Sequence, residues 1–581
     1  MLPCLIFEDE HLLVVNKPAG LNTHAPSPHA GEGLYDWLRH RAARWARLAI
    51  IHRLDKETSG VMVFAKTPLA NRSLTAQFTA HSIHKQYLLL TDRPVGQGEL
   101  TVKSALVRAG DRYVSRPVHQ GAKTAETRFR ECRMQNAECR GSGGCRMVEA
   151  EPLTGRTHQI RIHAADKGFP VLGDTLYGGT PAPRVYLHAA KLTLQHPASG
   201  EELSFQAPTG PDWPNTPASG PAEASEDRRR EVGPFPFLAL REALIEPELT
   251  DAYRLIHGAS DGWPGWYVER LGDFLLSQSA QGLSQEQREE LGRLLRVSHS
   301  NPRSTRRQSG LTFPSADYAS SARGACHKVL TRLVRRTAQA EGSPQWVLGD
   351  TATERFTVRE NGLQFELSFR EGYSVGLFLD QRDNRRRLLT QHVAADFPLL
   401  PAASGNEPWE MLNTFAYTCG FSVCAAKAGA RTTSLDLSKR WLDWGRRNFQ
   451  LNQVDPTGHD FLYGEAFDWL RRLVRKQRLF DVIVLDPPTF SQSKESGVFR
   501  AEKDYGRLVT AALPLLKSGG VLFASTNAAD WPPEKFLADV DAAIHKAKRT
   551  VLQRHYVPQP PDFPISRAEP AYLKTVWLRI E

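Results

Sequence analysis

A proline-rich segment at residues 208–236 divides this 581-residue chain and limits what it can fold into. Its seven prolines, which alternate with Gly, Ser and Ala, are Pro208, Pro211, Pro214, Pro217, Pro221, Pro234 and Pro236. Proline lacks an amide hydrogen and fixes φ, so the segment can form neither a helix nor a continuous sheet strand. We therefore predict a linker between separately folding parts, because a chain of this length is too long for one core.

Composition is typical of a globular protein that could bind a polyanion. Hydrophobic residues make up 41% and charged residues 24% of the chain, which is ordinary for a globular fold. The net charge is +10, and excess Lys and Arg bind phosphate groups with release of counterions. This net charge is compatible with binding to RNA or to DNA, and it could also serve only to keep the protein soluble. It therefore does not identify a partner.

The sequence predicts a cytoplasmic protein without a membrane segment or a metal centre. No apolar run reaches the roughly 20 residues that a membrane helix needs, and the acidic N-terminus lacks a signal-peptide pattern. Seven cysteines are few for this length, which indicates reduced thiols. Cys132, Cys139 and Cys145 form a cluster, but their spacing is not that of a zinc site.

Patterning on either side of the linker predicts two kinds of fold. Residues 1–207 contain short β-like runs broken by turns, and residues 237–354 suggest a small α/β domain with an amphipathic helix near 285–295. A Ser/Arg-rich stretch at about 299–324 is expected to be a disordered basic loop inside that domain. From 355 to 581, strand and helix patterns alternate, with parallel strands expected at 411–415, 433–437 and 482–485.

Residues 52–60 read His-Arg-Leu-Asp-Lys-Glu-Thr-Ser-Gly and place the acid Asp55 among basic and hydroxyl side chains. Such a nonamer could be a solvated surface turn. Its length and order resemble the motif around the catalytic aspartate of RluA-type pseudouridine synthases. The resemblance implies that Asp55 acts at C1′ of a target uridine, either by attack or by removal of a ribose proton, and that no cofactor is needed.

Two further motifs extend this resemblance over about residues 5–207. Residues 153–163 suggest a strand in which Arg161 and Gln159 share one face, and the family pattern implies that Arg161 pairs with Asp55. Tyr87 matches the tyrosine that stacks on the target base and that could handle the C5 proton, although a Tyr there could equally be core packing. The family implies an α+β domain with a mixed, largely antiparallel sheet.

A different chemistry is indicated near residues 411–422, where a strand enters a turn and a helix. Nucleotide-like ligands bind at such turns in doubly wound sheets. The turn has one glycine rather than the three of a dinucleotide fingerprint, which disfavours NAD. Asp436 ends the next strand, and Asp486-Pro487-Pro488 ends a third. A lone strand-end Asp could be a helix N-cap, but the three elements in this order favour S-adenosylmethionine.

Residues 237–581 resemble large-subunit rRNA methyltransferases of the RlmI/RlmK type. The resemblance implies a Rossmann-like class I domain with a mostly parallel seven-stranded sheet, and it implies that Asp486, Pro487 and Pro488 are catalytic. The implied cofactor contacts are Asn413, Phe415, Tyr417, Gly420, Asp436, Glu465 and Asp486. Asp468 competes with Glu465 for the adenine-contacting position.

The atom that receives the methyl group can be argued from cysteine placement. Cytosine C5 reacts only after a thiolate adds at C6, and no Cys lies near residues 486–494 or 523–528. Guanine N7 has an in-plane lone pair and needs only placement. We expect a bifunctional enzyme that makes pseudouridine and methylates guanine N7 in 23S rRNA. The alternatives are cytosine-C5 methylation and an rRNA-binding assembly factor with one or both sites inactive.

Overall fold

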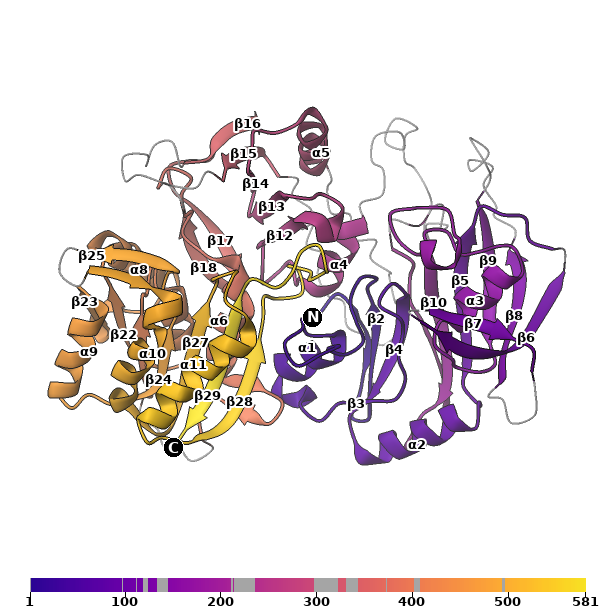
Figure 1. Cartoon of the computed structure of the whole chain (residues 1–581), viewed down its shortest axis with the longest axis horizontal. Coiled ribbons are helices and arrows are strands. Elements are labelled where there is room, and N and C mark those ends of the chain that lie inside the picture. Colours follow the sequence, from indigo (N-terminus) through magenta and orange to yellow (C-terminus); the bar gives the residue numbers. More distant parts are fainter. Residues whose placement is uncertain are drawn as a thin grey trace, which may run out of the picture. The chain divides into compact units, whose positions relative to one another are not determined.

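The computed structural model describes residues 2–96, 98–110, 112–118, 124–132, 145–210, 213, 236–296, 322–330, 343–371, 374–401, 408–493 and 497–581. The chain folds into two compact units, traced in Figure 1. The first comprises residues 1–24, 33–35 and 47–246, and the second comprises residues 25–32, 36–46 and 247–581. The expected linker and the basic insertion lie almost entirely outside the described residues.

The first unit is built on an 11-stranded sheet in which β4 and β10 pair in parallel and the other described pairings are antiparallel. Along the sheet the order is β1-β2-β4-β10-β5-β9-β8-β6-β7, with β11 on β10 and β3 on β4. The strands are β1 (Leu5–Glu8), β2 (Leu12–Lys17), β3 (Ala49–Ile50), β4 (Ser59–Ala65), β5 (His84–Thr91), β6 (Glu99–Ala109), β7 (Arg112–Arg116), β8 (Thr124–Cys132), β9 (Arg146–Pro152), β10 (Leu187–Gln195) and β11 (Glu202–Gln206).

Helices cover this sheet through apolar faces. Helix α2 (Pro68–Thr79) packs Ala70 and Leu74 against strand residues such as Val61 and Val63. Helix α3 (Gln159–Asp166) packs Ile160 against Leu89 and Val148. Helix α4 (Pro236–Leu244) completes the unit. These contacts form two hydrophobic clusters that fix the loops at the strand ends.

The expected strand around Arg161 is wrong, because this segment is helix α3. His158 adopts a left-handed conformation (φ +54°) and the chain winds into a helix from Gln159 onward. The first six helical residues are all buried. Because the buried part of this short helix includes both apolar and polar side chains, the helix lacks an amphipathic pattern, and its sequence can also be interpreted as an alternating strand.

The main part of the second unit, residues 247–581, starts with a small α/β domain. Its five-stranded sheet has the order β12-β13-β14-β15-β16. The strands are β12 (Ala252–His257), β13 (Trp266–Leu271), β14 (Phe274–Ser279), β15 (Gly324–Val329) and β16 (Gln345–Gly349). Helix α5 (Gln285–Arg296) matches the predicted amphipathic helix, with Leu291 and Leu294 buried and its charged residues largely outward. The hairpin of β17 (Phe356–Glu360) and β18 (Leu363–Leu367) follows.

A seven-stranded sheet forms the rest of the second unit. Its order is β23-β22-β21-β24-β27-β29-β28, with four parallel pairings followed by two antiparallel ones. The strands are β21 (Glu410–Thr414), β22 (Arg431–Asp436), β23 (Asp460–Tyr463), β24 (Phe480–Leu485), β27 (Leu516–Thr526), β28 (Val551–Val557) and β29 (Lys574–Ile580). Two short hairpins accompany it: β19 (His392–Ala394) with β20 (Phe397–Pro398), and β25 (Phe490–Ser493) with β26 (Gly497–Arg500).

Helices lie on both faces of this sheet because the central strands are apolar on both sides. Val482 and Val484 pack on the side of α6 (Arg382–Thr390), α7 (Gly420–Lys427) and α8 (Lys439–Leu451). Ile483 and Leu485 pack on the side of α9 (Ala466–Arg475), α10 (Ala501–Ala512) and α11 (Pro533–Lys546). The alternation follows the two-residue period of a strand. The carboxyl ends of β21, β22 and β24 therefore meet at one edge.

Most of helix α1 (Leu34–Arg41) belongs to the second unit although it lies early in the chain. The buried Trp37 indole donates to Asp383 at 3.1 Å, and Arg386 donates to the Arg41 carbonyl. The sequence prediction placed this segment in the first domain. In the described part of the chain, no helix is both long and apolar enough to cross a bilayer.

Candidate active sites

The loop that carries Asp55 is fixed on both sides by buried polar contacts. Asp55 lies between β3 and β4. The Thr23 hydroxyl donates to the Leu54 carbonyl at 2.8 Å and accepts from the Leu54 amide at 3.2 Å. The buried Lys17 ammonium donates to the Lys56 carbonyl at 3.2 Å. The residues before and after Asp55 are thus anchored, which limits movement of its carboxylate.

Gly60 is required where the motif enters β4. Its φ is +120°, and a Cβ there would collide with the backbone of Ala189. Only glycine combines this conformation with so close an approach. Ala189 pairs with Gly60 on one side and with Tyr87 on the other. The β4–β10–β5 register therefore brings Tyr87 and the end of the Asp55 motif to neighbouring strands.

Two basic side chains approach the Asp55 carboxylate. Arg161 Nη1 lies 3.7 Å and His158 Nε2 lies 3.9 Å from Asp55 Oδ2. The Asp55 side chain keeps 26% of its surface exposed, so a substrate can reach it. The predicted pairing of Arg161 with Asp55 is thus present as an ion pair, but it is too long for a hydrogen bond.

Arg161 is held in place by a residue for which the sequence analysis proposed no role, Asp174. Arg161 Nε donates to Asp174 Oδ2 at 2.6 Å and Nη2 donates to Oδ1 at 2.8 Å. The side chains of both residues are buried, at 4% and 1% exposure. A bidentate pair of this kind is geometrically strict, and it leaves Nη1 facing Asp55 and Glu57.

His158 and Tyr177 were also not predicted. His158 Nδ1 lies 2.8 Å from the Tyr177 hydroxyl, and burial lowers the pKa of His158 while the charge of Asp55 opposes that shift. Arg161 lies over the Tyr177 ring at 5.3 Å. Asp174 and Tyr177 lie in the turn at residues 173–178, and His158 lies in the 153–163 motif, three positions before Arg161. For His158, this proximity to Arg161 was the available sequence signal.

Two other residues of the motif region are neutral. Burial and the charge of Asp55 raise the pKa of Tyr87, so its phenol keeps its proton at neutral pH. Burial lowers the pKa of His52 to about 3, and His52 Nε2 accepts from the Val63 amide at 3.1 Å. His52 therefore supports the sheet, whereas Tyr87 is a neutral aromatic group in the electrostatic field of Asp55.

In the second unit, the turn between β21 and α7 has an unusual backbone. Phe415, Tyr417 and Cys419 adopt left-handed conformations with φ of 57°, 48° and 64°. Each costs about 1–2 kcal/mol for a residue with a side chain, and such residues cluster at functional sites. The Tyr417 amide donates to Asp436 Oδ2 at 2.8 Å, so the turn is joined to the end of β22.

Asp436 has acceptor positions left for a ligand. Its Oδ1 accepts from the Ser438 amide at 2.8 Å, and burial raises the pKa of Asp436. A carboxylate has about four acceptor positions, and the backbone amides of Tyr417, Leu437 and Ser438 donate to it. Acceptor capacity therefore remains for the ribose of a ligand. This carboxylate is thus suited to an adenosine-containing cofactor.

The remaining predicted cofactor residues differ in where they face. Asn413 is buried, and its amide donates to the Ser422 hydroxyl at 2.9 Å, which joins β21 to α7. Gly420 begins α7, where a Cβ would come within 3.2 Å of the Arg385 side chain. Glu465 caps α9 by accepting from the Asp468 amide at 2.9 Å.

Asp486 lies at the end of β24, facing α6. Gln381 Nε2 lies 3.3 Å from both Asp486 oxygens and donates to the Ser525 hydroxyl at 2.8 Å. Burial raises the pKa of Asp486 to about 6, with Asp380 adding to the shift and Ser525 opposing it. Pro487 is buried, whereas Pro488 is exposed. Phe490 is 57% exposed.

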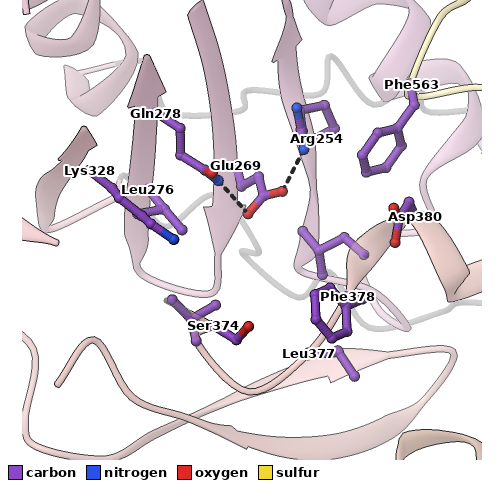
Figure 2. A pocket seen from close by; sticks show the side chains of 12 residues that line it. Arg254, Glu269, Leu276, Gln278, Lys328, Ser374, Leu377, Phe378, Asp380 and Phe563 are labelled. Carbon is purple, nitrogen blue, oxygen red and sulfur yellow. Dashed lines mark hydrogen bonds and ion pairs between the residues drawn. The ribbon is translucent and has the colours of Figure 1, made fainter. Parts of the chain in front are cut away.

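A cavity of about 150 Å³ lies beside this edge of the second unit. Figure 2 shows Arg254, Glu269 and Gln278 on strands at one side and Ser374 and Phe378 at the other. Asp380, next to Gln381, also lines it. Phe378 packs on Tyr417 with ring centroids 5.3 Å apart, so the cavity borders the β21–α7 turn.

Two family models match the chain. One for RNA pseudouridylate synthase matches residues 11–166, and one for S-adenosylmethionine-dependent methyltransferase matches residues 253–579. The first match contains Asp55, Tyr87 and Arg161, and the second contains the turn, Asp436 and Asp486. The two sites described above therefore fall in two different family domains.

Individual proteins match one part of the chain or the other. A ribosomal RNA large subunit methyltransferase of Deinococcus radiodurans is 30% identical over 356 residues, which cover 59% of this chain and 77% of that protein. The ribosomal large subunit pseudouridine synthase C of Escherichia coli K12 is 37% identical over 223 residues, which cover 35% of this chain and 66% of that protein. A solved putative methyltransferase complexed with SAH is 28% identical, with a TM-score of 0.46, and the match covers 57% of this chain and 76% of that one.

Proposed function

The chain belongs to the S-adenosylmethionine-dependent methyltransferase family and carries an RNA pseudouridylate synthase domain before it, and we propose that it makes two modifications of large-subunit ribosomal RNA. The names of relatives in both halves support this substrate, since each refers to the large ribosomal subunit. The net charge of +10 is compatible with RNA phosphates. The single most important observation is that each family domain contains its own carboxylate-centred site.

In the first unit, Asp55 is the proposed catalytic carboxylate. Pseudouridine formation breaks the bond from C1′ to N1 and joins C1′ to C5, so a carboxylate is needed near the ribose. The Arg161 guanidinium lies 3.7 Å from the Asp55 carboxylate and is its proposed counter-ion. Tyr87, as a neutral phenol, is the proposed stacking partner of the uracil ring. The uridine must leave its RNA stack to reach them.

In the second unit, the proposed cofactor site is formed by the 415–419 turn and by Asp436, Glu465 and Asp486. S-adenosylmethionine supplies a methyl group on a cationic sulfur when bound. Asp436 would accept hydrogen bonds from the ribose hydroxyl groups, and Glu465 would contact the adenine. Asp486, aligned by Gln381, would face the reacting centre, and the Pro487-Pro488 backbone would keep that strand end rigid.

We propose guanine N7 as the atom that accepts the methyl group, because the described cysteines do not offer the thiolate that methylation of cytosine C5 requires. Cys326, Cys419 and Cys424 are buried in the second unit, and burial raises the pKa of each. None of them is among the residues that line the cavity. A cytosine-C5 reaction needs a thiolate at the base, whereas N7 needs only an oriented lone pair.

Incubation of the purified full-length protein with unmodified 23S rRNA transcript and S-adenosylmethionine tests the proposal. We expect nucleoside mass spectrometry to detect both pseudouridine and 7-methylguanosine. Formation of 5-methylcytidine instead of 7-methylguanosine would contradict the choice of atom. If neither modification forms on naked or ribosome-bound rRNA, the assembly-factor alternative holds.

A further inference from the structure

The cavity beside Asp486 has the chemistry of a site for a planar polar ring. Its volume is about 150 Å³, whereas a single water needs about 10–15 Å³ on a comparable measure. Apolar and aromatic groups, including Leu276, Phe378 and Phe563, share the wall with charged ones. Phe378 keeps 47% of its surface exposed, and aromatic rings are the usual platforms for an unstacked base.

Glu269 is the acceptor in this wall. It is 8% exposed; its Oε1 accepts from Arg254 Nη2 at 2.8 Å and its Oε2 accepts from Gln278 Nε2 at 3.4 Å. Each oxygen keeps a further acceptor position. Arg254 opposes the rise that burial causes in the pKa of Glu269. The carboxylate can thus take two more hydrogen bonds side by side.

Lys328 adds a donor on the same sheet face. It pairs in register with Gln278, so the two side chains lie on adjacent strands, β14 and β15, and both line the cavity. Burial lowers the pKa of Lys328 to about 8, and Glu269 opposes the shift, so the ammonium persists at neutral pH. One wall therefore combines a two-oxygen acceptor with a nearby cationic donor.

Asp380 links the cavity to the proposed methyl-transfer centre, because its charge acts on Asp486. Asp380 lines the cavity, and the next residue, Gln381, contacts both oxygens of Asp486. Asp380 accepts from the Tyr572 hydroxyl at 2.9 Å, which fixes its orientation. A base held by Glu269 would therefore lie in the same cavity as Asp380, next to the residue that contacts Asp486.

We propose that this cavity recognises the acceptor guanine, with Glu269 accepting from N1–H and the N2 amino group and Lys328 donating to O6. The proposal rests on the proposed function and adds the residues that select the base. In guanine, N7 lies across the ring system from the N1–N2 edge, so this orientation directs N7 toward Asp486. In cytosine, C5 adjoins the N4-bearing carbon, so a carboxylate that held N4 would keep C5 on the Glu269 side.

Binding of mononucleotides to the full-length protein saturated with SAH tests this assignment. Saturation-transfer NMR would compare GMP with IMP, which lacks only the N2 amino group. We expect the wild-type protein to prefer GMP by about tenfold or more, because a buried acceptor is left unpaired by IMP. Glu269→Gln should lose this preference and reduce methyl transfer to 23S rRNA transcript at least tenfold, with unchanged SAH affinity.

Glu290→Gln is the matched control. Glu290 is also buried and paired with an arginine in the small domain, at 2.9 Å from Arg293, but it does not line the cavity. Its variant should keep the wild-type preference. The proposal is overturned if wild-type protein fails to bind GMP at millimolar concentration, or if Glu269→Gln discriminates like wild type. Both results differ from failure of the proposed function, in which wild-type protein forms no 7-methylguanosine.

Discussion

At the scale of single residues, the two carboxylates proposed as catalytic lie in different surroundings. Asp55 is partly exposed and lies between a histidine and an arginine. Asp486 is contacted by a neutral amide and a hydroxyl, and burial raises its pKa to about 6. The surroundings of Asp486, rather than its residue type, therefore place its titration near neutrality.

Loss of Asp174 should harm the first unit more than loss of a surface carboxylate. Asp174→Asn removes the bidentate partner of a buried guanidinium, which costs about 3–5 kcal/mol when a buried pair is broken. We expect lower resistance of that unit to urea and slower pseudouridine formation. Glu126→Gln, which breaks the exposed pair with Lys103 at 3.3 Å, should cost less than about 1 kcal/mol. Equal losses in the two variants would contradict the role given to Asp174.

Binding of S-adenosylmethionine should depend on pH through Asp486. The cationic sulfur favours the charged carboxylate, so protons compete with the cofactor below the pKa of about 6. We expect affinity to be constant above about pH 7 and to fall up to tenfold per pH unit below the pKa. Calorimetry from pH 5 to 8 measures this, and neutral SAH and Asp486→Asn should both show a flatter profile. A wild-type profile as flat as that of Asp486→Asn would refute the assignment.

Sequence motifs identified individual residues better than their partners. Asp55, Arg161 and Tyr87 follow from the motif order, and the structure brings Asp55 and Arg161 to 3.7 Å. The bond from Arg161 to Asp174 spans 13 positions and depends on how α3 and the 173–178 turn pack. Sequence spacing alone does not show whether Asp55 or Asp174 lies nearer to Arg161.

At the scale of elements, strands marked by continuous apolar runs were predictable and a buried helix was not. β21, β22 and β24 lie where their apolar runs placed them, because Val482 and Ile483 point to opposite covered faces. Helix α3 was mistaken for a strand because its buried residues include Ile160 and Ile162 in an alternating order. The left-handed His158 that starts it has no unambiguous sequence signature.

The strained 415–419 turn makes its own prediction. Gly445 lies in α8 against Cys419, and a Cβ at Gly445 would meet the Cys419 thiol. Gly445→Ala should therefore displace the turn and weaken binding of S-adenosylmethionine, although Ala normally stabilises a helix by about 0.5–1 kcal/mol. Gly506→Ala in α10, where the nearest atom is 3.9 Å away, should stabilise the unit. Calorimetry and thermal unfolding test both, and unchanged cofactor affinity in Gly445→Ala would count against the turn as the binding site.

At the scale of the whole molecule, one chain contains two enzyme domains, and the two compact units are each built from segments that are discontinuous in the sequence. Residues 25–32 and 36–46 belong to the second unit although they lie within the synthase half of the sequence. Composition could locate the proline-rich segment, but no local pattern shows that Trp37 bonds to Asp383, 346 positions away. The family domains could therefore be predicted from sequence motifs. The assignment of residues 25–32 and 36–46 to a unit required the three-dimensional structure.

The most direct test of two independent sites is nucleoside mass spectrometry of 23S rRNA from cells that lack the protein and are complemented with single variants. Asp55→Asn should restore 7-methylguanosine but not pseudouridine, and Asp486→Asn should restore pseudouridine but not 7-methylguanosine. Wild-type protein should restore both. Loss of both modifications in either variant, despite normal protein levels, or full restoration by both variants, would contradict the account.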